Sequence, residues 1–385
     1  MKIDKLKNNW LNQSSSQFLT KVFRDYGYQA LFVGGCVRNS ILNIPVVDID
    51  MATDAFPEAI IKISKEHNIK FIPTGIEHGT ITLIIDKIAY QITTFRSDIT
   101  NDGRHAKVKF TTSLLLDASR RDLTINALYC DGYGQILDPL NALEDLNNNI
   151  IRFIGDSNKR ITEDYLRILR FFRFQAIYGN KMLEIDSSAL AACQEHKNKL
   201  ATLSKERITS ELHKLLLSDN PVRTMRKMID TGVLNQIIKN CKISSFVSYI
   251  DAEKKYKIKI NWLGRLLSLH GKNIEEVLTF SRQELKMIKY IKRSMEENAS
   301  VFEFSYYNGT EYGIIYLLLQ NGRKKIALSK KLINNVSSIM TKKFPVTAKD
   351  LMPKLKGKKL GDELKRLETQ WIKSDFTLSK NQLLS

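Results

Sequence analysis

Cysteine is scarce in this sequence, and long apolar runs are missing from it. Cys36, Cys130, Cys193 and Cys241 are scattered over 385 residues, without the Cys-x-x-Cys or Cys/His spacing of a zinc site. We therefore expect no zinc, and reduced thiols of the kind found in cytoplasmic proteins. No run of about 18 apolar residues is present to cross a membrane. The N-terminal stretch MKIDKLKNNWLNQ also lacks the apolar core of a secretory signal. These absences predict a cytoplasmic protein with no membrane span.

Basic residues outnumber acidic residues, and the excess is confined to one part of the chain. The sequence has 60 Lys and Arg against 41 Asp and Glu, a formal net charge of +19. Residues 1–150 contain 16 basic and 17 acidic side chains, so the following 235 residues contain 44 and 24. The nearly neutral residues 1–150 are suited to catalysis. The basic residues 151–385 are suited to binding a polyanion such as nucleic acid. A basic surface without a partner is the alternative interpretation.

Short strand-like and helix-like patterns alternate over the first 140 residues. They predict strands at 31–33 and 46–52, a helix at 57–68, and hairpins at 80–95 and 127–139.

The polar stretch 96–110 is interrupted by Asn-Asp-Gly and predicts a mobile loop. After about residue 145 long helical patterns dominate, such as 161–179 and 203–218, and strand signals are few. The chain therefore reads as an α/β head followed by an all-α rear.

The stretch ALFVGGCVRNSILNIPVVDIDMAT, residues 30–53, combines two glycines with two aspartates. Gly34 and Gly35 would let backbone N–H groups approach a ligand, and Arg38 would add a charge. Side chains alternate along a strand, so Asp48 and Asp50 would project from one face. Their charges repel unless cations lie between them, and two Mg²⁺ ions bound to a nucleoside triphosphate would meet that need. A solvated edge strand after a tight turn is the alternative.

The stretch SRRDLTINALY, residues 119–129, offers further contacts for a nucleotide. Arg120 and Arg121 could hold phosphates bidentately, while Asp122 or Asn126 bonds a ribose hydroxyl. Ordinary salt bridges at a helix N-terminus are the alternative.

The stretch TEDYLRILRFFRF, residues 162–174, suggests a reader of nucleotide bases. On one continuous helix, Glu163 and Asp164 would cluster with Arg167, which could mean no more than helical ion pairs. Cytosine and adenine, however, each place an amino group beside a ring-nitrogen acceptor. Asp164 could accept from the amino group and Arg167 could donate to the acceptor, whereas guanine and uracil present the reverse polarity. Arg170 and Arg173 continue the basic face.

Five of these motifs resemble, in order, those of class II tRNA nucleotidyltransferases, the CCA-adding enzymes, and of the related bacterial poly(A) polymerases. They are GGCVRN…DIDMAT, RRDLTINALY, DPLNALEDL, EDYLRILRFFRF and LSKERITSEL. The set spans residues 30 to about 215, and residues 345–364 also resemble the family's tail.

The resemblance implies an α+β protein. A mixed α/β nucleotidyltransferase head of the DNA polymerase beta superfamily would be followed by an all-α neck, body and tail. The expected boundaries are 1–145 for the catalytic head, 146–220 for the neck with the base-reading motif, 221–310 for the body, and 311–385 for the basic, tRNA-binding tail.

Residue roles follow from the same resemblance. Asp48 and Asp50 are the expected catalytic metal ligands for two Mg²⁺ ions. The expected nucleotide-binding residues are Gly34, Gly35, Arg38, Arg120, Arg121, Asp122, Asn126, Glu163, Asp164, Arg167 and Arg170. Ser204, Glu206 and Arg207 match a motif that supports the neck, and residues 97–110 match a flexible loop of CCA- and A-adding members.

Several positions depart from the family pattern. Asn39 and Gln91 stand where acidic residues are usual, so metal binding could rest on two aspartates. Asn141 and Ala142 replace glycines, which could stiffen a hinge between head and neck. No His-Asp dipeptide is present, so we expect no added phosphohydrolase domain of that type.

The expected function is therefore addition of C, C and A to the 3′ end of tRNA from CTP and ATP, with release of pyrophosphate. The expected partners are the tRNA acceptor arm and the two nucleotides. A poly(A) polymerase or A-adding enzyme of the same family is one alternative. A catalytically inactive RNA-binding protein is an alternative of another class.

Overall fold

The computed structural model describes residues 1–3, 8–100, 107–352 and 354–385, and it divides into two compact units. One unit is Met1–Ile237 and the other is Ile238–Ser385. The expected four-part division into head, neck, body and tail stays a prediction. Among the described residues, no helix is long and apolar enough to cross a membrane.

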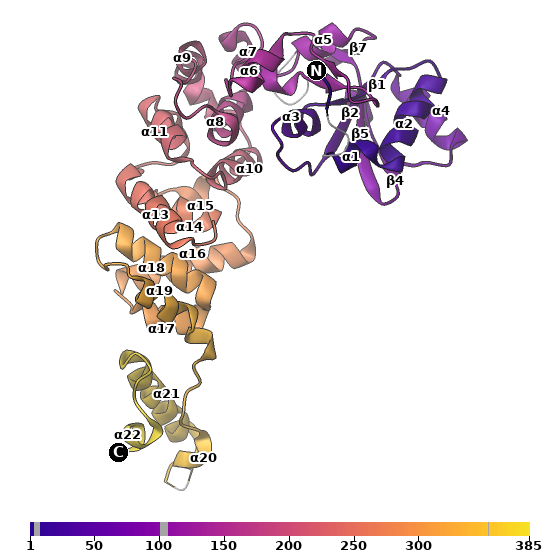
Figure 1. Ribbon diagram of the computed structural model, residues 1–385. Helices are drawn as coiled ribbons and strands as arrows, with labels where there is room; N and C mark the ends of the chain where they lie inside the picture. The colour runs from indigo at the N-terminus through magenta and orange to yellow at the C-terminus, as the bar shows by residue number, and fades with distance from the viewer. Residues whose placement is uncertain (4–7, 101–106, 353) are drawn as a thin grey trace. The chain divides into compact units, whose positions relative to one another are not determined.

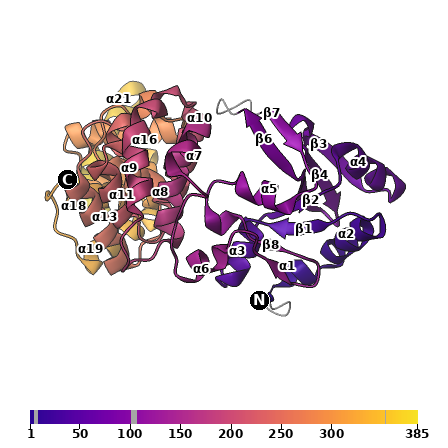
Figure 2. The same ribbon diagram turned by 90° about the horizontal axis from the view of Figure 1, so that it is seen from above.

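A seven-stranded mixed sheet forms the first part of unit Met1–Ile237 (Figures 1 and 2). Its strands, in spatial order, are β3 (Lys70–Gly75), β4 (Thr80–Ile85), β5 (Ile88–Thr94), β2 (Ile49–Thr53), β1 (Ala30–Val33), β8 (Tyr129–Cys130) and β9 (Ile136–Leu137). Strands β2 and β5 are parallel and the other neighbours are antiparallel. The helices of this part are α1 (Asn9–Asn12), α2 (Ser14–Asp25), α3 (Gly35–Ile41), α4 (Pro57–Glu66), α5 (Leu114–Ser119) and α6 (Ala142–Asn147). The mixed α/β head expected from the sequence is confirmed.

Local turn chemistry explains several of these elements. Asp86 and Lys87 both have positive φ, the conformation of a two-residue turn whose twist matches that of the flanking strands β4 and β5. Pro57 occupies the first turn of α4, where its missing N–H costs no hydrogen bond. The strand predicted at 46–52 begins only at Ile49, which is the first residue of β2 paired with β5.

The prediction of a mobile loop at 96–110 is wrong for residues 96–100 and 107–110, which form strands. Strand β6 (Arg96–Thr100) pairs antiparallel with β7 (Lys107–Phe110) in a separate two-stranded sheet. In the sequence KVKF, lysines alternate with apolar residues, which is the pattern of a strand with one packed face. Phe110 indeed packs against Phe56, with ring centroids 5.8 Å apart. The Asn-Asp-Gly stretch lies at 101–103, outside the described residues.

Helices make up the rest of this unit. They are α7 (Ser157–Glu163), α8 (Leu166–Tyr178), α9 (Ser187–His196), α10 (Lys205–Leu216), α11 (Val222–Asp230) and α12 (Val233–Ile237). The single helix predicted over 161–179 is broken at Asp164, whose backbone is extended with φ −157° and ψ 110°. An Asp164 carboxylate oxygen accepts the Leu166 N–H at 3.0 Å, so the same side chain that interrupts α7 starts α8.

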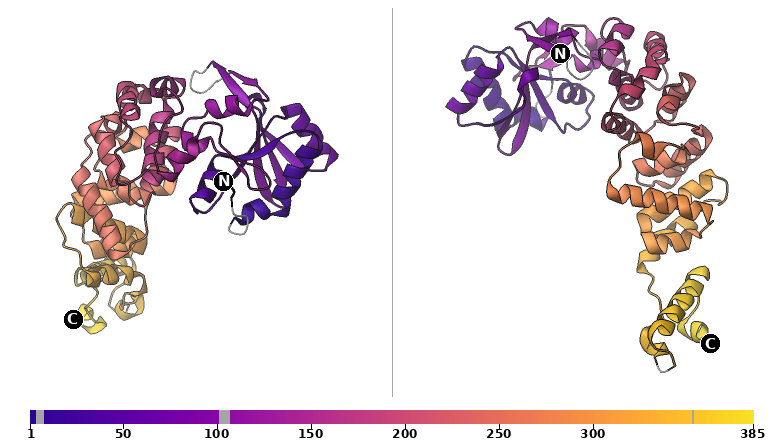
Figure 3. Two further views of the ribbon diagram at one scale, coloured as in Figure 1. Left: turned by 45° about the horizontal axis from the view of Figure 1, so that its top comes forward. Right: turned by 180° about the vertical axis from the view of Figure 1, so that it is seen from behind.

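The described part of unit Ile238–Ser385 is helical, as expected (Figure 3). Its helices are α13 (Ile243–Tyr256), α14 (Trp262–Ser268), α15 (Ile274–Val277), α16 (Arg282–Glu296), α17 (Val301–Asn308), α18 (Thr310–Gly322), α19 (Lys330–Ser337), α20 (Ala348–Leu351), α21 (Gly357–Lys373) and α22 (Lys380–Leu384). Helix α18 is buried from Ile315 to Gln320 and packs against α13, α14 and α17. Short 3₁₀ turns complete the chain: η1 (Ile76–His78), η2 (Thr124–Asn126), η3 (Lys197–Thr202) and η4 (Ile339–Thr341).

Candidate active site

An open cavity of about 400 Å³ lies within unit Met1–Ile237. It is lined by Gly34, Gly35, Arg38, Asp50, Arg120, Arg121, Asp122, Asn126, Asp164, Arg167, Arg170, Arg173 and Phe174. Eleven of these are residues expected at the site from the sequence. They come from the β1–α3 turn, α3, β2, the segment from the end of α5 to η2, Asp164 between α7 and α8, and α8 itself. Six arginines against three aspartates make the lining suited to an anion.

The glycine turn gives the cavity a wall of backbone. Gly34 ends β1 with φ +69°, a conformation that other residues rarely adopt, and it is the residue before α3. A Cβ atom built on Gly34 would lie 3.8 Å from an Arg121 side-chain nitrogen, and one on Gly35 would lie 3.7 Å from Arg38. The main chain at this turn therefore runs close to two guanidinium groups, and phosphate binding by the turn stays a prediction.

The two aspartates occupy different environments. Asp50 lies on β2, lines the cavity and is half-buried. Burial raises its pKa, the nearby Arg121 opposes the shift, and the charge of Asp48 adds to it. Asp48 precedes the strand, is exposed and is not part of the lining. The strand on which the sequence placed both aspartates therefore includes Asp50 but not Asp48, and the two carboxylates interact electrostatically.

Gln91 stands beside Asp50 on the neighbouring strand. The two residues are direct partners in the parallel β2–β5 pairing. An amide thus occupies the position where the family pattern places a carboxylate. Among the described residues, no group of three or more His, Cys, Asp or Glu side chains is arranged to hold a metal ion.

A carboxylate that sequence reasoning missed, Asp117, holds the two adjacent arginines. One of its oxygens accepts from Arg120 Nε and Nη2 at 2.9 and 2.6 Å. The other accepts from Arg121 Nη2 at 3.0 Å and from the Tyr129 hydroxyl at 2.7 Å. Burial alone would raise the pKa of Asp117, but the two arginines and Tyr129 lower it to about 2. Its position three and four residues before the arginines on a helical pattern is the signal that could have revealed it.

Asp122 holds a second set of side chains. It accepts from Arg170 Nε at 2.6 Å and from Asn126 Nδ2 at 2.9 Å, and Arg38 donates to Asn126 in turn. Burial opposes ionisation of Asp122, but Arg170 and Asn126 hold its pKa well below the usual range. Both carboxylate oxygens are thus engaged by protein groups. Asp122 fixes Arg170 in the cavity wall, and its expected contact with a ribose hydroxyl stays a prediction.

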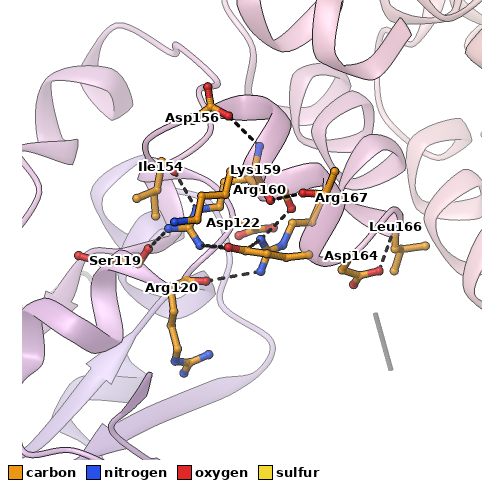
Figure 4. A network of polar contacts seen from close by, with 12 residues as sticks. Ser119, Arg120, Asp122, Ile154, Asp156, Lys159, Arg160, Asp164, Leu166 and Arg167 are labelled. Carbon is orange, nitrogen blue, oxygen red and sulfur yellow. Dashed lines mark hydrogen bonds and ion pairs between the residues drawn. The ribbon is translucent and has the colours of Figure 1, made fainter. Parts of the chain in front are cut away.

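The predicted cluster of Glu163, Asp164 and Arg167 is divided between separate ion pairs. Figure 4 shows Asp164 bonded to Leu166, whereas Arg167 bonds to other groups. Arg167 pairs with Glu163 and donates to the Arg160 carbonyl at 2.9 Å. Asp164 instead accepts from Arg207 Nη2, on α10, at 2.6 Å. The extended backbone at Asp164 turns its side chain away from the helical position that would have met Arg167. Both Asp164 and Arg167 still line the cavity.

Two further arginines tie these elements together. Arg160 on α7 donates to the Ile154 carbonyl at 2.8 Å and to the Ser119 carbonyl at the end of α5, and it pairs with Glu163 at 2.9 Å (Figure 4). Arg173 pairs with Glu211 and lies over the ring of Phe174, 4.2 Å from its centroid. Phe174 is a cavity residue that the sequence reasoning did not single out.

Of the three residues expected to support the neck, Arg207 is the one that bonds to a cavity residue. Arg207 reaches the carboxylate of Asp164, whereas Ser204 precedes α10 and Glu206 lies in its first turn. Neither Ser204 nor Glu206 lines the cavity.

Replacing Asp117 tests the buried pairing. We expect Asp117→Asn to lower the free energy of unfolding by about 2 kcal/mol or more at neutral pH, because Arg120 and Arg121 lose their shared counter-charge. The pKa of Asp117 is depressed from 3.8 to about 2. Its contribution is therefore complete above about pH 4 and is lost as pH falls toward 2, so the difference from wild type should shrink over that interval.

Urea unfolding followed by Trp10 fluorescence measures this difference between pH 2 and 7. Trp10 is the one tryptophan of residues 1–237, so the comparison uses a background with Trp262→Phe and Trp371→Phe. Glu195→Gln, at an exposed position on α9, serves as the control and should change stability by less than about 0.5 kcal/mol. A pH-independent difference for Asp117→Asn would contradict the assigned pairing.

Two family models match parts of the chain up to residue 242. Residues 30–152 match the family model described as the poly A polymerase head domain, and residues 182–242 match the probable RNA- and SrmB-binding site of polymerase A. Among solved structures, the Bacillus stearothermophilus CCA-adding enzyme in complex with CTP has the same fold. It gives a TM-score of 0.73 at 24% identity, over 94% of this chain and 92% of that one. The Thermotoga maritima CCA-adding enzyme complexed with tRNA gives 0.72 at 18% identity, over 100% and 97%.

Curated relatives are more similar in sequence. The mitochondrial CCA tRNA nucleotidyltransferase 1 of Mus musculus is 31% identical over 95% of this chain and 88% of its own length. The CCA-adding enzyme of Ligilactobacillus salivarius is 31% identical over 94% and 92%. Identity at this level over nearly the whole of each chain shows that this chain belongs to the family of CCA tRNA nucleotidyltransferases.

Proposed function

We infer that this protein adds C, C and A in turn to the 3′ end of tRNA, using CTP and ATP and releasing pyrophosphate. The observation that carries the inference is one cavity lined by Asp50, by six arginines and by the pair Asp164 and Arg167. Membership of the CCA tRNA nucleotidyltransferase family supports the same reaction.

The arginines beside the glycine turn suit a triphosphate. Arg120 and Arg121 carry positive charge next to the main chain of Gly34 and Gly35, and Asp117 holds both guanidinium groups in place. Groups fixed before the substrate arrives need no reorganisation when charge develops on the transferring phosphate. The proposed role of these side chains is to hold the β- and γ-phosphates that leave as pyrophosphate.

Nucleotidyl transfer in this family depends on a metal ion, and we propose two Mg²⁺ ions held by Asp48 and Asp50. The donor set fits, because carboxylate oxygens and phosphate oxygens are the ligands that Mg²⁺ prefers. The pKa of Asp50 is raised by burial, opposed by Arg121 and raised further by the charge of Asp48, so a cation bound between the two carboxylates would relieve their repulsion. When bound, the ions would neutralise the triphosphate and activate the terminal ribose hydroxyl of the tRNA.

Base choice is assigned to Asp164 and Arg167. Asp164 would accept from the amino group of cytosine or adenine, and Arg167 would donate to the neighbouring ring nitrogen. Separate partners orient the two side chains, Arg207 for Asp164 and Glu163 with the Arg160 carbonyl for Arg167. Their spacing is therefore set by two helices and does not depend on a contact between them.

Residues 238–385 are proposed to hold the tRNA. They contain 29 Lys and Arg against 14 Asp and Glu. Contacts to phosphates release counterions, so the affinity for tRNA should fall steeply with salt. The cytoplasmic location expected from the reduced cysteines stays a prediction of this proposal.

Three tRNA transcripts test the function, ending in the discriminator base, in C and in CC. Each is incubated with the full chain, Mg²⁺ and labelled CTP or ATP, and the products are sized at single-nucleotide resolution. Growth by CCA that then stops is the expected result. Addition of A to the CC transcript alone would indicate an A-adding enzyme, and a long A ladder a poly(A) polymerase. No product on any transcript would favour the inactive RNA-binding protein.

Removing Asp50 should separate catalysis from tRNA binding. We expect Asp50→Ala to reduce nucleotide incorporation by more than about a hundredfold, since even outer partners of a metal site are worth 10- to 100-fold. Gel-shift affinity for tRNA should stay within about twofold of wild type. The exposed control Glu195→Ala should incorporate nucleotides normally. Near-normal turnover by Asp50→Ala would refute the metal assignment.

Removing Arg167 should relax base choice. We expect Arg167→Ala to keep residual turnover while the preference for CTP and ATP over GTP and UTP falls by about 5- to 150-fold, the value of one bidentate base contact. Single-turnover incorporation from each of the four nucleotides measures this preference. Arg24→Ala, which is outside the cavity lining, is the matched control. An unchanged preference in Arg167→Ala would exclude the base-reading role.

A further inference from the structure

A groove in unit Ile238–Ser385 is not used by the chemistry described above. It has a volume of about 570 Å³ and lies among α16, α17 and α18. It is lined by Gln283, Lys286, Met287, Tyr290, Arg293, Ser294, Glu297, Tyr307, Asn308 and Tyr312. The groove therefore combines three tyrosines with two cationic side chains.

Helix α16 presents two different faces. Gln283, Lys286, Tyr290, Arg293 and Glu297 follow one another at intervals of three or four residues, so they form one stripe along the helix and line the groove. The buried face of α16 carries a separate apolar set, Met287, Ile288, Ile291 and Met295, of which only Met287 also borders the groove. The tyrosine-bearing stripe is therefore additional to the face that packs the core.

Two of the aromatic rings are available to a ligand. The side chains of Tyr290 and Tyr307 are 42% and 55% exposed. Lys286 Nζ lies 5.6 Å from the centroid of the Tyr290 ring. Tyr307 is in edge contact with Tyr306, whose hydroxyl donates to Glu368 at 2.9 Å and whose ring packs against Trp371. The Tyr307 ring is thus supported from behind by a side chain fixed in the core.

The charges around the groove are mixed, because Glu368 and Glu303 lie near Tyr307 and Glu311 and Glu284 near Tyr312, where burial and these acids raise the pKa of each tyrosine. Lys286 and Arg293 are the cations of the lining and Glu297 is its one acid, which is already paired with Arg293 at 2.8 Å. The surrounding unit carries 29 basic against 14 acidic side chains. A planar, uncharged base with a phosphate attached complements exposed aromatic faces beside lysine and arginine.

We propose that this groove binds an unpaired nucleotide of the RNA substrate, with its base stacked on Tyr290 or Tyr307 and its phosphate near Lys286. The proposal rests on the inference that the substrate is tRNA, whose loops contain unpaired bases that aromatic side chains can stack. The groove then supplies a second anchor point on the RNA, separate from the cavity that holds the incoming nucleotide.

Binding of tRNA by the full chain, without CTP or ATP, tests the groove. Tyr290→Ala and Tyr307→Ala should each weaken the Kd by about 5- to 100-fold, the effect of removing a stacked aromatic ring. Tyr290→Phe and Tyr307→Phe keep the ring and should stay within about twofold. Lys286→Gln should reduce the slope of log K against log salt by about 1, as loss of one phosphate contact does, whereas Lys289→Gln on the same helix should not. Tyr133→Ala, an exposed tyrosine of residues 1–237, should leave the Kd unchanged.

A second readout does not depend on activity. 2-Aminopurine placed in turn at the unpaired loop positions of tRNA should be quenched by the wild-type chain at one position or more, and that quench should disappear in Tyr307→Ala or Tyr290→Ala. Wild-type Kd values and unchanged quenching in both alanine variants would refute nucleotide binding by the groove, even if CCA addition is intact. Tyrosine-dependent quenching without any CCA addition would support RNA binding by the groove and would refute the proposed function.

Discussion

The active cavity depends on holding several arginines close together in partly buried positions, although their charges repel. The structure meets this constraint by pairing five of the six cavity arginines with a carboxylate, while Arg38 donates to Asn126 and Tyr178. Asp117 serves Arg120 and Arg121, Asp122 serves Arg170, Glu163 serves Arg167 and Glu211 serves Arg173. Such pairs contribute little net stability, because removing the charges from water offsets much of the attraction. Their effect is to fix where each guanidinium points, so the anion-binding surface exists before an anion arrives.

The same pairs join segments that are distant in the sequence. Asp122 and Arg170 link the segment after α5 to α8, and Asp164 and Arg207 link the start of α8 to α10. Arg160 adds bonds from α7 to the carbonyls of Ser119 and Ile154. The arginines proposed to bind phosphates and the residues proposed to read the base therefore belong to one connected framework. A nucleotide held at its phosphates is consequently presented to Asp164 and Arg167 at a fixed distance.

Much of this arrangement could be predicted from the sequence, and the failures have different physical causes. Alternation and turn signals predicted β1, the β4–β5 hairpin and the start of α4 at Pro57. The motifs predicted eleven of the thirteen cavity residues. The pairing of β6 with β7 was missed because polar residues obscure its alternation. The helix break at Asp164 was missed because its side chain bonds the backbone ahead of it within a pattern that looks continuous. No periodicity reveals such a bond.

The missed residues have a related explanation. Asp117 looks like an ordinary helical ion-pair partner in the sequence, and its importance appears only when Tyr129 from β8 completes its hydrogen bonds. Phe174 reads as one more apolar residue of α8. Its role beside Arg38, Arg170 and Arg173 depends on how those side chains fold back over its ring. Sequence patterns reveal which residues can pair, but they do not reveal which of several available partners is chosen.

The position of Gln91 sets a limit on how the metal site can work. Its partnership with Asp50 across β2 and β5 places a neutral amide where a third carboxylate would otherwise concentrate negative charge. Two carboxylates attract a cation less strongly than three, so the phosphates of the nucleotide must supply more of the ligand oxygens. A site of this composition binds metal and nucleotide best together, because each reduces the electrostatic cost of the other. The six arginines then have a second effect. In the proposed mechanism they bind the triphosphate, whose phosphate oxygens then act as metal ligands beside Asp48 and Asp50.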